Sequence, residues 1–194
     1  MNLLKHIYPA VALTIVLMVL LGIVYPFVTT GLSELLFKEK ARGSLIEREG
    51  KVIGSRLIGQ PFKGASYFHS RPSAAGSGYD ATASGGTNFG PTSKQFFKEQ
   101  IKGRAKEAHA ENPNIKIPID LITSSGSGLD PHISPAAAEF QVPRIARERR
   151  MEEDQVKQLV RKHTEGRQFG ILGEPRINVL ELNLELDEAL GKGK

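Results

Sequence analysis

A long apolar segment near the N-terminus limits what this chain can fold into more than any other feature. The segment runs from Pro9 to Thr30, and no aspartate, glutamate, lysine or arginine occurs between Lys5 and Glu34. Because a helix rises about 1.5 Å per residue, roughly 20 apolar residues span the hydrocarbon core of a bilayer. A backbone in lipid must satisfy its own hydrogen bonds, and a helix does so. The sequence therefore predicts a transmembrane helix over residues 9–31.

Two other structures can contain an apolar segment of this kind. A cleaved signal peptide has a shorter apolar run and a small-residue cleavage site, which the sequence V-T-T-G-L-S-E after Phe27 does not offer. A helix buried in a soluble core needs apolar surroundings, which the rest of the chain does not supply. A membrane anchor is favoured over both. Charge leaves its orientation open, because the flanking lysines and arginines weakly favour a cytoplasmic C-terminal side, whereas long domains translocate regardless of such charges.

The remainder of the chain predicts one soluble α+β domain after this single N-terminal transmembrane helix. The expected organisation is a tail at 1–8, the transmembrane helix at 9–31, a neck at 32–43, the α+β domain at 44–190 and a tail at 191–194. Turn residues and hydrophobic periodicity predict its elements. They are a β-hairpin at 44–55, a short strand or loop at 56–62, a structured loop at 63–93, a helix at 94–111, a strand at 117–123, a helix capped by Ser134 and kinked at Pro143, a helix at 152–164 and a strand at 180–186.

Composition excludes several classes of function. The 194 residues include no cysteine, which removes disulfides, cysteine–zinc sites and thiol nucleophiles. The net charge is +5, and acidic residues interrupt the basic cluster formed by Arg144, Arg147, Arg149 and Arg150. Because aromatic residues do not alternate with these arginines, no nucleic-acid partner is expected. Anionic lipid headgroups or an acidic surface of a partner are the better candidates for this cluster.

Catalytic and metal-binding motifs are missing from the sequence. It has no G-x-x-x-x-G-K-[ST], no H-E-x-x-H and no G-x-S-x-G, so no NTPase loop, metal site or nucleophile elbow is predicted. A triad of Ser127, His132 and Asp130 would lie within a single turn, where the three side chains rarely point correctly. We therefore expect no catalytic residue and no metal ligand in this chain.

Two glycine-rich turns are the only candidates for a nucleotide site. Such turns can present backbone N–H groups to a phosphate, but neither contains a lysine, which favours simple tight turns with positive φ. The candidate residues are Ser84, Gly85, Gly86, Thr87, Asn88, Gly126, Ser127 and Gly128.

The two loops that contain these turns also predict a partner-facing surface, over Tyr67–Pro91 and Ser124–Pro135. They have few aliphatic residues yet keep several aromatic ones, and aromatic residues on loops are typical of binding surfaces. The alternative is that the aromatic rings fold inward and pin the loops. Arg71 is expected either to anchor the loop or to pair with Asp80. The partner-facing candidates are Tyr67, Phe68, Arg71, Tyr79, Phe89, Asp130 and His132.

Several long motifs occur in a specific order after the apolar segment. They include Y-F-H-x-R-P-S-A from Tyr67, S-G-G-T-N-F-G-P from Ser84, T-S-S-G-S-G-L-D-P-H-I-S-P-A-A-A from Thr123, Q-V-P-R-I-A from Gln141 and G-E-P-R-I-N-V-L-E-L-N-L-x-L-D from Gly173. With these motifs the chain resembles the C subunit of the Kdp-type potassium-transporting ATPase over nearly its whole length.

This resemblance implies a subunit of a bacterial ATP-driven, high-affinity potassium importer. The implied partners are a channel-like potassium-binding subunit, a P-type ATPase subunit, a small peptide subunit and the lipid bilayer. The family has one transmembrane helix in the cell inner membrane, with the N-terminus cytoplasmic and the C-terminal domain extracytoplasmic. It is also described as a catalytic chaperone that raises the pump's affinity for ATP, so ATP would act through the complex and no cofactor is assigned to this chain.

Three functions follow from the sequence and the resemblance. The first is a non-catalytic accessory subunit that assembles or stabilises the complex and supports ATP-coupled potassium transport. The second is a nucleotide-binding regulatory subunit, which the glycine-rich turns favour and the missing lysine disfavours. The third is a membrane-anchored hydrolase using Ser127, which the missing nucleophile elbow disfavours.

Overall fold

The computed structural model describes residues 4–90 and 92–191. Residues 1–3 and 192–194 of the two predicted tails, and Pro91 of the predicted partner-facing loop, lie outside the described residues. The chain divides into two compact units between Ser55 and Arg56. The first unit contains a helix from Lys5 to Leu36 that is long and apolar enough to cross a membrane, and none of it is buried inside the chain. The predicted apolar helix is therefore confirmed, and it continues beyond residue 31.

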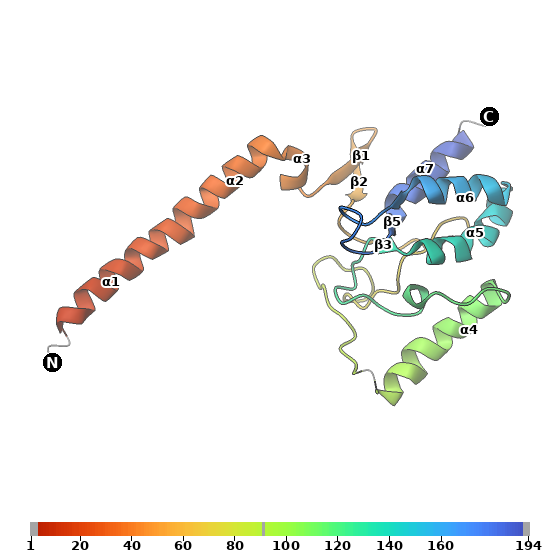
Figure 1. The fold of residues 1–194 in the computed structure, drawn as a ribbon, viewed down its shortest axis with the longest axis horizontal. Helices are drawn as coiled ribbons and strands as arrows, with labels where there is room; N and C mark the ends of the chain where they lie inside the picture. The colour runs from red at the N-terminus through yellow and green to blue at the C-terminus, as the bar shows by residue number, and fades with distance from the viewer. Residues whose placement is uncertain (1–3, 91, 192–194) are drawn as a thin grey trace. The chain divides into compact units, whose positions relative to one another are not determined.

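This long helix (Figure 1) contains a wider, π-helical turn at its centre. It consists of α1 (Leu4–Val19), a π-helical turn (Leu20–Val24) and α2 (Tyr25–Leu36). The Tyr25 N–H bonds the carbonyl of Leu20, five residues earlier. Pro26 explains this widening, because proline lacks an N–H and its ring clashes with the carbonyl four residues earlier. Threonine hydroxyls near the turn bond helix carbonyls, as Thr29 does with the Tyr25 oxygen at 2.9 Å.

The first unit ends in the predicted β-hairpin. A short helix, α3 (Lys38–Ala41), precedes the antiparallel strands β1 (Leu45–Arg48) and β2 (Lys51–Ser55). Glu49 and Gly50, with φ angles of 50° and 74°, form the turn between them. Two successive left-handed residues match the right-handed twist of a hairpin, and glycine adopts that conformation freely. The hairpin prediction over residues 44–55 is confirmed.

The second unit is an α+β domain with a small antiparallel sheet. The sheet has the strand order β3 (His132–Ile133), β5 (Arg176–Asn178), β4 (Thr164–Glu165). Three helices, α5 (Pro135–Arg149), α6 (Glu153–Lys162) and α7 (Val179–Gly191), lie side by side (Figure 1), and α4 (Lys102–Glu111) follows a π-helical stretch at Phe96–Ile101. The core residues come mainly from α5, α6 and α7: Ala137, Ala138, Val142, Ile145, Ala146, Val156, Val160, Val179, Leu182 and Leu186, together with Phe68, Ile133 and Ile177.

Local sequence determines where α5 and α6 begin. The Ser134 hydroxyl accepts the Ala137 N–H at 3.1 Å, and Pro135 occupies the first turn. Glu152 and Gln155 form a capping box at the start of α6. These contacts satisfy N–H groups that have no partner within a helix. The two helices occur where they were predicted, as does the helix predicted at 94–111, whereas the kink predicted at Pro143 stays a prediction.

Two strand predictions are wrong. Residues 117–123 contain only a 3₁₀ turn, Ile119–Leu121, because the Asp120 carboxylate accepts the Ser134 N–H at 2.7 Å and fixes a turn instead of a ladder. Residues 180–186 belong to α7. The leucine and glutamate residues of this segment favour a helix, and that preference prevailed over the alternating pattern.

We expect Ser134→Ala to lower the free energy of unfolding by about 1 kcal/mol, the usual loss at a helix N-cap. The Ser134 hydroxyl also lies 3.2 Å from an oxygen of Asp120, so the change removes two contacts. Thermal unfolding of the full chain in detergent measures this. A melting temperature equal to that of the unchanged chain would show that this cap does not stabilise α5.

Candidate functional site

The two glycine-rich turns pack against each other, backbone to backbone. The Gly85 N–H and the Ser84 hydroxyl both donate to the Ser127 carbonyl oxygen, at 2.9 and 3.0 Å. The Gly128 N–H donates to the Ser125 carbonyl at 3.3 Å. Both glycine N–H groups are thus used within the chain, whereas a phosphate-binding loop presents such donors to its ligand.

Close approach explains two of the glycines. A Cβ on Gly128 would lie 2.6 Å from the Ala75 nitrogen and 2.7 Å from the Gly85 oxygen, and its φ is +68°. A Cβ on Gly86 would lie 3.0 Å from the Gly126 oxygen. The other nucleotide candidates lie beside this contact, with Thr87 half-buried and Asn88 exposed. Nucleotide binding by these turns stays a prediction, and the packing of the turns does not require it.

We expect Gly128→Ala to destabilise the chain by roughly 1–3 kcal/mol, because the new Cβ clashes with backbone and the left-handed conformation strains alanine. Gly126→Ala is the matched control, since its Cβ would meet nothing within 4 Å. Thermal unfolding of both full-length variants in the same detergent compares them. Equal melting temperatures would contradict the close-packing explanation for Gly128.

The aromatic residues Tyr79 and Phe89 of the first loop make contacts within the loop and with the helical stretch that follows it. The Tyr79 hydroxyl donates to the Arg71 carbonyl at 2.6 Å, and the Tyr79 N–H donates to the Ser73 hydroxyl at 2.8 Å. Burial raises the pKa of Tyr79, although the charge of Arg104 opposes this shift. The Tyr79 hydroxyl therefore stays protonated and able to donate. The Phe89 ring lies 5.6 Å from that of Phe96, between ring centres. These contacts agree with the alternative in which the aromatic rings fold inward and pin the loop, and they do not require a partner.

Tyr67 and Phe68 take part in the same inward packing. Phe68 is 0% exposed and belongs to the hydrophobic core, so its prediction as a partner-facing residue is wrong. Tyr67 is half-buried, with its ring 5.6 Å from the Phe62 ring and the Arg149 guanidinium 4.6 Å above it. Side chains alternate along an extended segment, which turns Phe68 inward between two less buried neighbours.

Three partner-facing candidates meet in one polar cluster. Arg71 lies 3.3 Å from an oxygen of Asp130, so it pairs with this residue and not with Asp80. The His132 N–H donates to the other Asp130 oxygen at 3.0 Å, and the His132 ring nitrogen lies 3.5 Å from it. Burial raises the pKa of the Asp130 carboxyl, but hydrogen bonds from His132 and the charge of Arg71 lower it by more. The pKa is therefore below its ordinary value, and the carboxyl is ionised at neutral pH.

A cleft of about 560 Å³ opens beside this cluster. Its walls come from three parts of the domain: the turn at 118–120, the start of α5 with β3, and the segment 174–176 that enters β5. Charged groups of both signs line it, and the exposed Ile119 forms part of its edge. A cleft with this mixture suits recognition of a polypeptide surface better than capture of one strongly charged ligand.

The lowered pKa of Asp130 predicts a pH-dependent contribution to stability. A carboxyl with a depressed pKa in the folded state stabilises fully above its unfolded pKa, about 3.9, and loses this contribution as pH falls through the folded value. We expect Asp130→Asn to lose less stability than the unchanged chain when pH falls from about 5 to below 3. Urea unfolding of the full chain at a series of pH values measures this, with the exposed Asp154→Asn as control. Parallel pH curves for Asp130→Asn and the unchanged chain would contradict the prediction.

The described residues do not assemble reaction chemistry around Ser127. Its hydroxyl accepts the Leu129 N–H at 3.1 Å and lies 3.4 Å from the Ser125 hydroxyl, and neither group is a base. Among the described residues, no group of three or more histidine, aspartate or glutamate side chains could hold a metal ion. The arrangement offers contacts and charge, and it lacks an activated nucleophile.

The basic cluster of α5 is partly buried, which the sequence did not indicate. Arg144 pairs with Glu111 at 2.8 Å and donates to the carbonyls of Ala65 and Tyr67. Arg149 pairs with Asp187 at 2.8 Å, with only 4% of its side chain exposed. The expectation of lipid headgroups or an acidic partner is therefore wrong for these two arginines, whereas Arg147 and Arg150 are exposed.

Comparison with known proteins gives a consistent result over almost the whole chain. Residues 7–188 match the family model KdpC, described as the c chain of the K+-transporting ATPase. A potassium-transporting ATPase KdpC subunit from Koribacter versatilis is 58% identical over 183 residues, covering 94% of each chain. That of Bradyrhizobium diazoefficiens is 51% identical over 201 residues, covering 97% of this chain and all of its own. That of Acidobacterium capsulatum is 53% identical over 184 residues, covering 95% and 98%.

Proposed function

The chain belongs to the KdpC family, the c chains of K+-transporting ATPases, and we propose that it is an accessory subunit of an ATP-driven potassium import complex with no catalytic site of its own. The family match over residues 7–188 carries this proposal. It is supported by Ser127, whose hydroxyl bonds only groups that cannot activate it. The subunit acts through contacts that assemble or stabilise the complex.

The apolar helix anchors the subunit in the cell inner membrane as a single pass. We place its N-terminus in the cytoplasm and the α+β domain on the extracytoplasmic side, as the family resemblance implies. The helix carries no charge between Lys5 and Glu34, so it packs beside other membrane helices without contributing groups to an ion path. Its partners are a channel-like potassium-binding subunit, a P-type ATPase subunit and a small peptide subunit.

ATP acts on this subunit indirectly. An extracytoplasmic domain does not meet cytoplasmic ATP, and the N–H groups of Gly85 and Gly128 in the two glycine-rich turns donate to carbonyls of this chain. The subunit therefore raises the ATP affinity of the pump, in the manner of a chaperone, by favouring one conformation of its partners. A ligand or subunit shifts such an equilibrium only as far as it binds the two conformations with different affinity.

A complementation experiment tests this proposal. In cells that lack the gene for this chain, we expect potassium-stimulated ATPase activity and potassium uptake to fall. The unchanged chain and Ser127→Ala should restore both equally, because no step uses the Ser127 hydroxyl. Failure of the unchanged chain to co-purify with the other subunits would contradict the accessory role. Lost uptake with Ser127→Ala, at normal amounts of assembled complex, would instead favour the hydrolase.

A further inference from the structure

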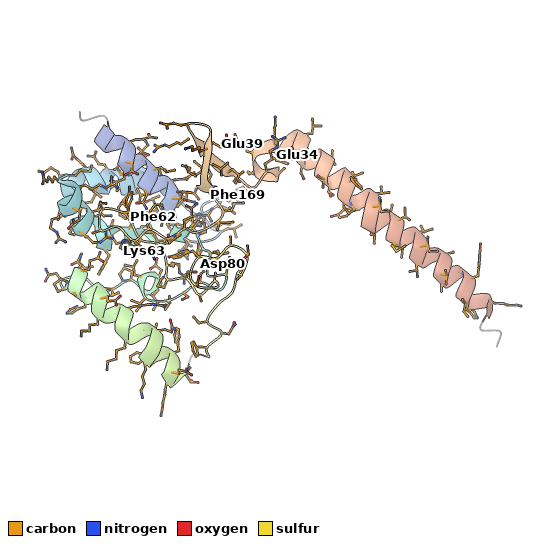
Figure 2. All side chains as sticks on the ribbon, turned by 180° about the vertical axis from the view of Figure 1, so that it is seen from behind. Glu34, Glu39, Phe62, Lys63, Asp80 and Phe169 are labelled. Atoms are coloured by element: carbon orange, nitrogen blue, oxygen red, sulfur yellow. The ribbon has the colours of Figure 1, made fainter. Side chains whose placement is uncertain are left out.

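The segment that leads into β5 forms a tight hairpin with an exposed apolar tip. Gln168 and Leu172 pair across it through two backbone hydrogen bonds of 2.9 Å. Phe169 (Figure 2) is 92% exposed, Ile171 74% and Leu172 54%. We call residues 169–172 the apolar knob. Among the described residues after Ser55, large exposed apolar side chains are otherwise scattered singly, which is ordinary for a protein surface.

The backbone of the apolar knob is not optimised for its own stability. Phe169 has a φ of +53°, in the left-handed region, where asparagine and glycine are favoured and a bulky side chain is strained. Gly170 and Gly173 also have positive φ, at 77° and 76°. A phenylalanine in this position lowers the stability of the free chain in two ways, because its backbone conformation is strained and its apolar ring is exposed to water. Such strain is typical of sites where a residue serves binding.

Charges at the base of the hairpin indicate which kind of partner fits. Arg167 forms a two-bond ion pair with Glu174 at 2.7 and 2.8 Å, and Arg176 pairs with Glu165 at 3.0 Å. The base is therefore neutral and its arginines are engaged. A loop that binds an anionic bilayer surface keeps cations for the headgroups, whereas a pocket in a protein rewards a rigid apolar group with a satisfied polar rim.

The cleft next to Asp130 continues this surface. Glu174, Pro175 and Arg176 belong to both the hairpin base and the wall of the cleft. The knob alone is far smaller than the roughly 800 Å² that each partner buries in a stable interface, so a protein that receives it must also contact its surroundings. The cleft and its exposed edge at Ile119 supply such surroundings.

We propose that the apolar knob inserts into an apolar pocket on another protein subunit of the transport complex. This inference rests on the proposed accessory function and names the element that makes the contact. Phe169 is the central anchor, and the paired charges at the hairpin base form the polar rim around it. This contact surface differs from the one predicted on the aromatic loop at 67–91, because the rings of that loop pack against other residues of the domain.

Phe169→Asn tests this, because asparagine tolerates the left-handed conformation and removes only the apolar group. In the intact purified complex, we expect the variant subunit to dissociate at least about tenfold more readily, as for loss of a hot-spot aromatic. The melting temperature of the free full-length chain should stay the same or rise. Phe97→Asn, at a residue 61% exposed on another element, is the control and should not weaken the association. Unchanged association, or an equal loss with Phe97→Asn, would overturn the proposal.

Photo-crosslinking from position 169 identifies the occupant. With benzoylphenylalanine at this position of the full chain in cells, we expect a covalent product with another subunit of the complex. Products with lipid alone or with a second copy of this chain would overturn the proposal, as would no product from a complex that has assembled. Any of these results would contradict the proposed contact but would leave the accessory function standing. The accessory function is contradicted only if the unchanged chain does not co-purify with the complex.

Discussion

Hydrogen bonds from buried side chains to the segment at 68–69, which follows a turn at 64–67, hold the domain together. No strand among the described residues pairs with this segment, yet the amide of Asn183 on α7 accepts the Phe68 N–H at 2.8 Å and donates to the Phe68 carbonyl at 3.0 Å. Gln141 on α5 does the same for the N–H and carbonyl of His69, at 2.8 and 3.2 Å. Each amide thus replaces one residue of a missing strand, and a buried backbone must be satisfied in this way or at considerable cost.

The rest of the domain follows from this arrangement. Holding residues 68–69 against α5 and α7 puts Phe68 into the core and leads the chain into the first glycine-rich loop. The sheet is small, so much of the domain consists of the two loops that contain the glycine-rich turns. These loops are held in place by packing backbone on backbone at Gly86 and Gly128, where larger residues do not fit. Arg144 adds a charged group to the same network, and its many contacts offset the cost of burying it.

These buried polar residues also mark the limit of what the sequence could predict. The transmembrane segment, the hairpin and the capped helices depend on local patterns, and they were predictable for that reason. Helix α7 was mistaken for a strand because Asn183 counted as a polar, outward position. Val179, Leu182, Asn183 and Leu186 are in fact all buried, at the spacing of one helical face. Only the distant partner Phe68 makes Asn183 a core residue. In the candidate site, the glycines were predictable as turns, but their contact across some 40 residues was not.

The apolar knob went unpredicted for a different reason: F-G-I-L-G has the composition of an ordinary turn next to a strand, and exposure is a property of the fold. Its small size is physically reasonable for a chain that carries its own anchor. A subunit held in the bilayer by an apolar helix already has little translational freedom, so a second contact with a neighbouring subunit forms at high effective concentration. Under that condition a few apolar side chains in a fixed conformation are enough to select one neighbouring subunit. The apolar helix, and not this contact, keeps the subunit in the membrane. A strained phenylalanine at the tip adds selectivity, because its conformation is set before binding and a pocket of the wrong shape receives no benefit from it.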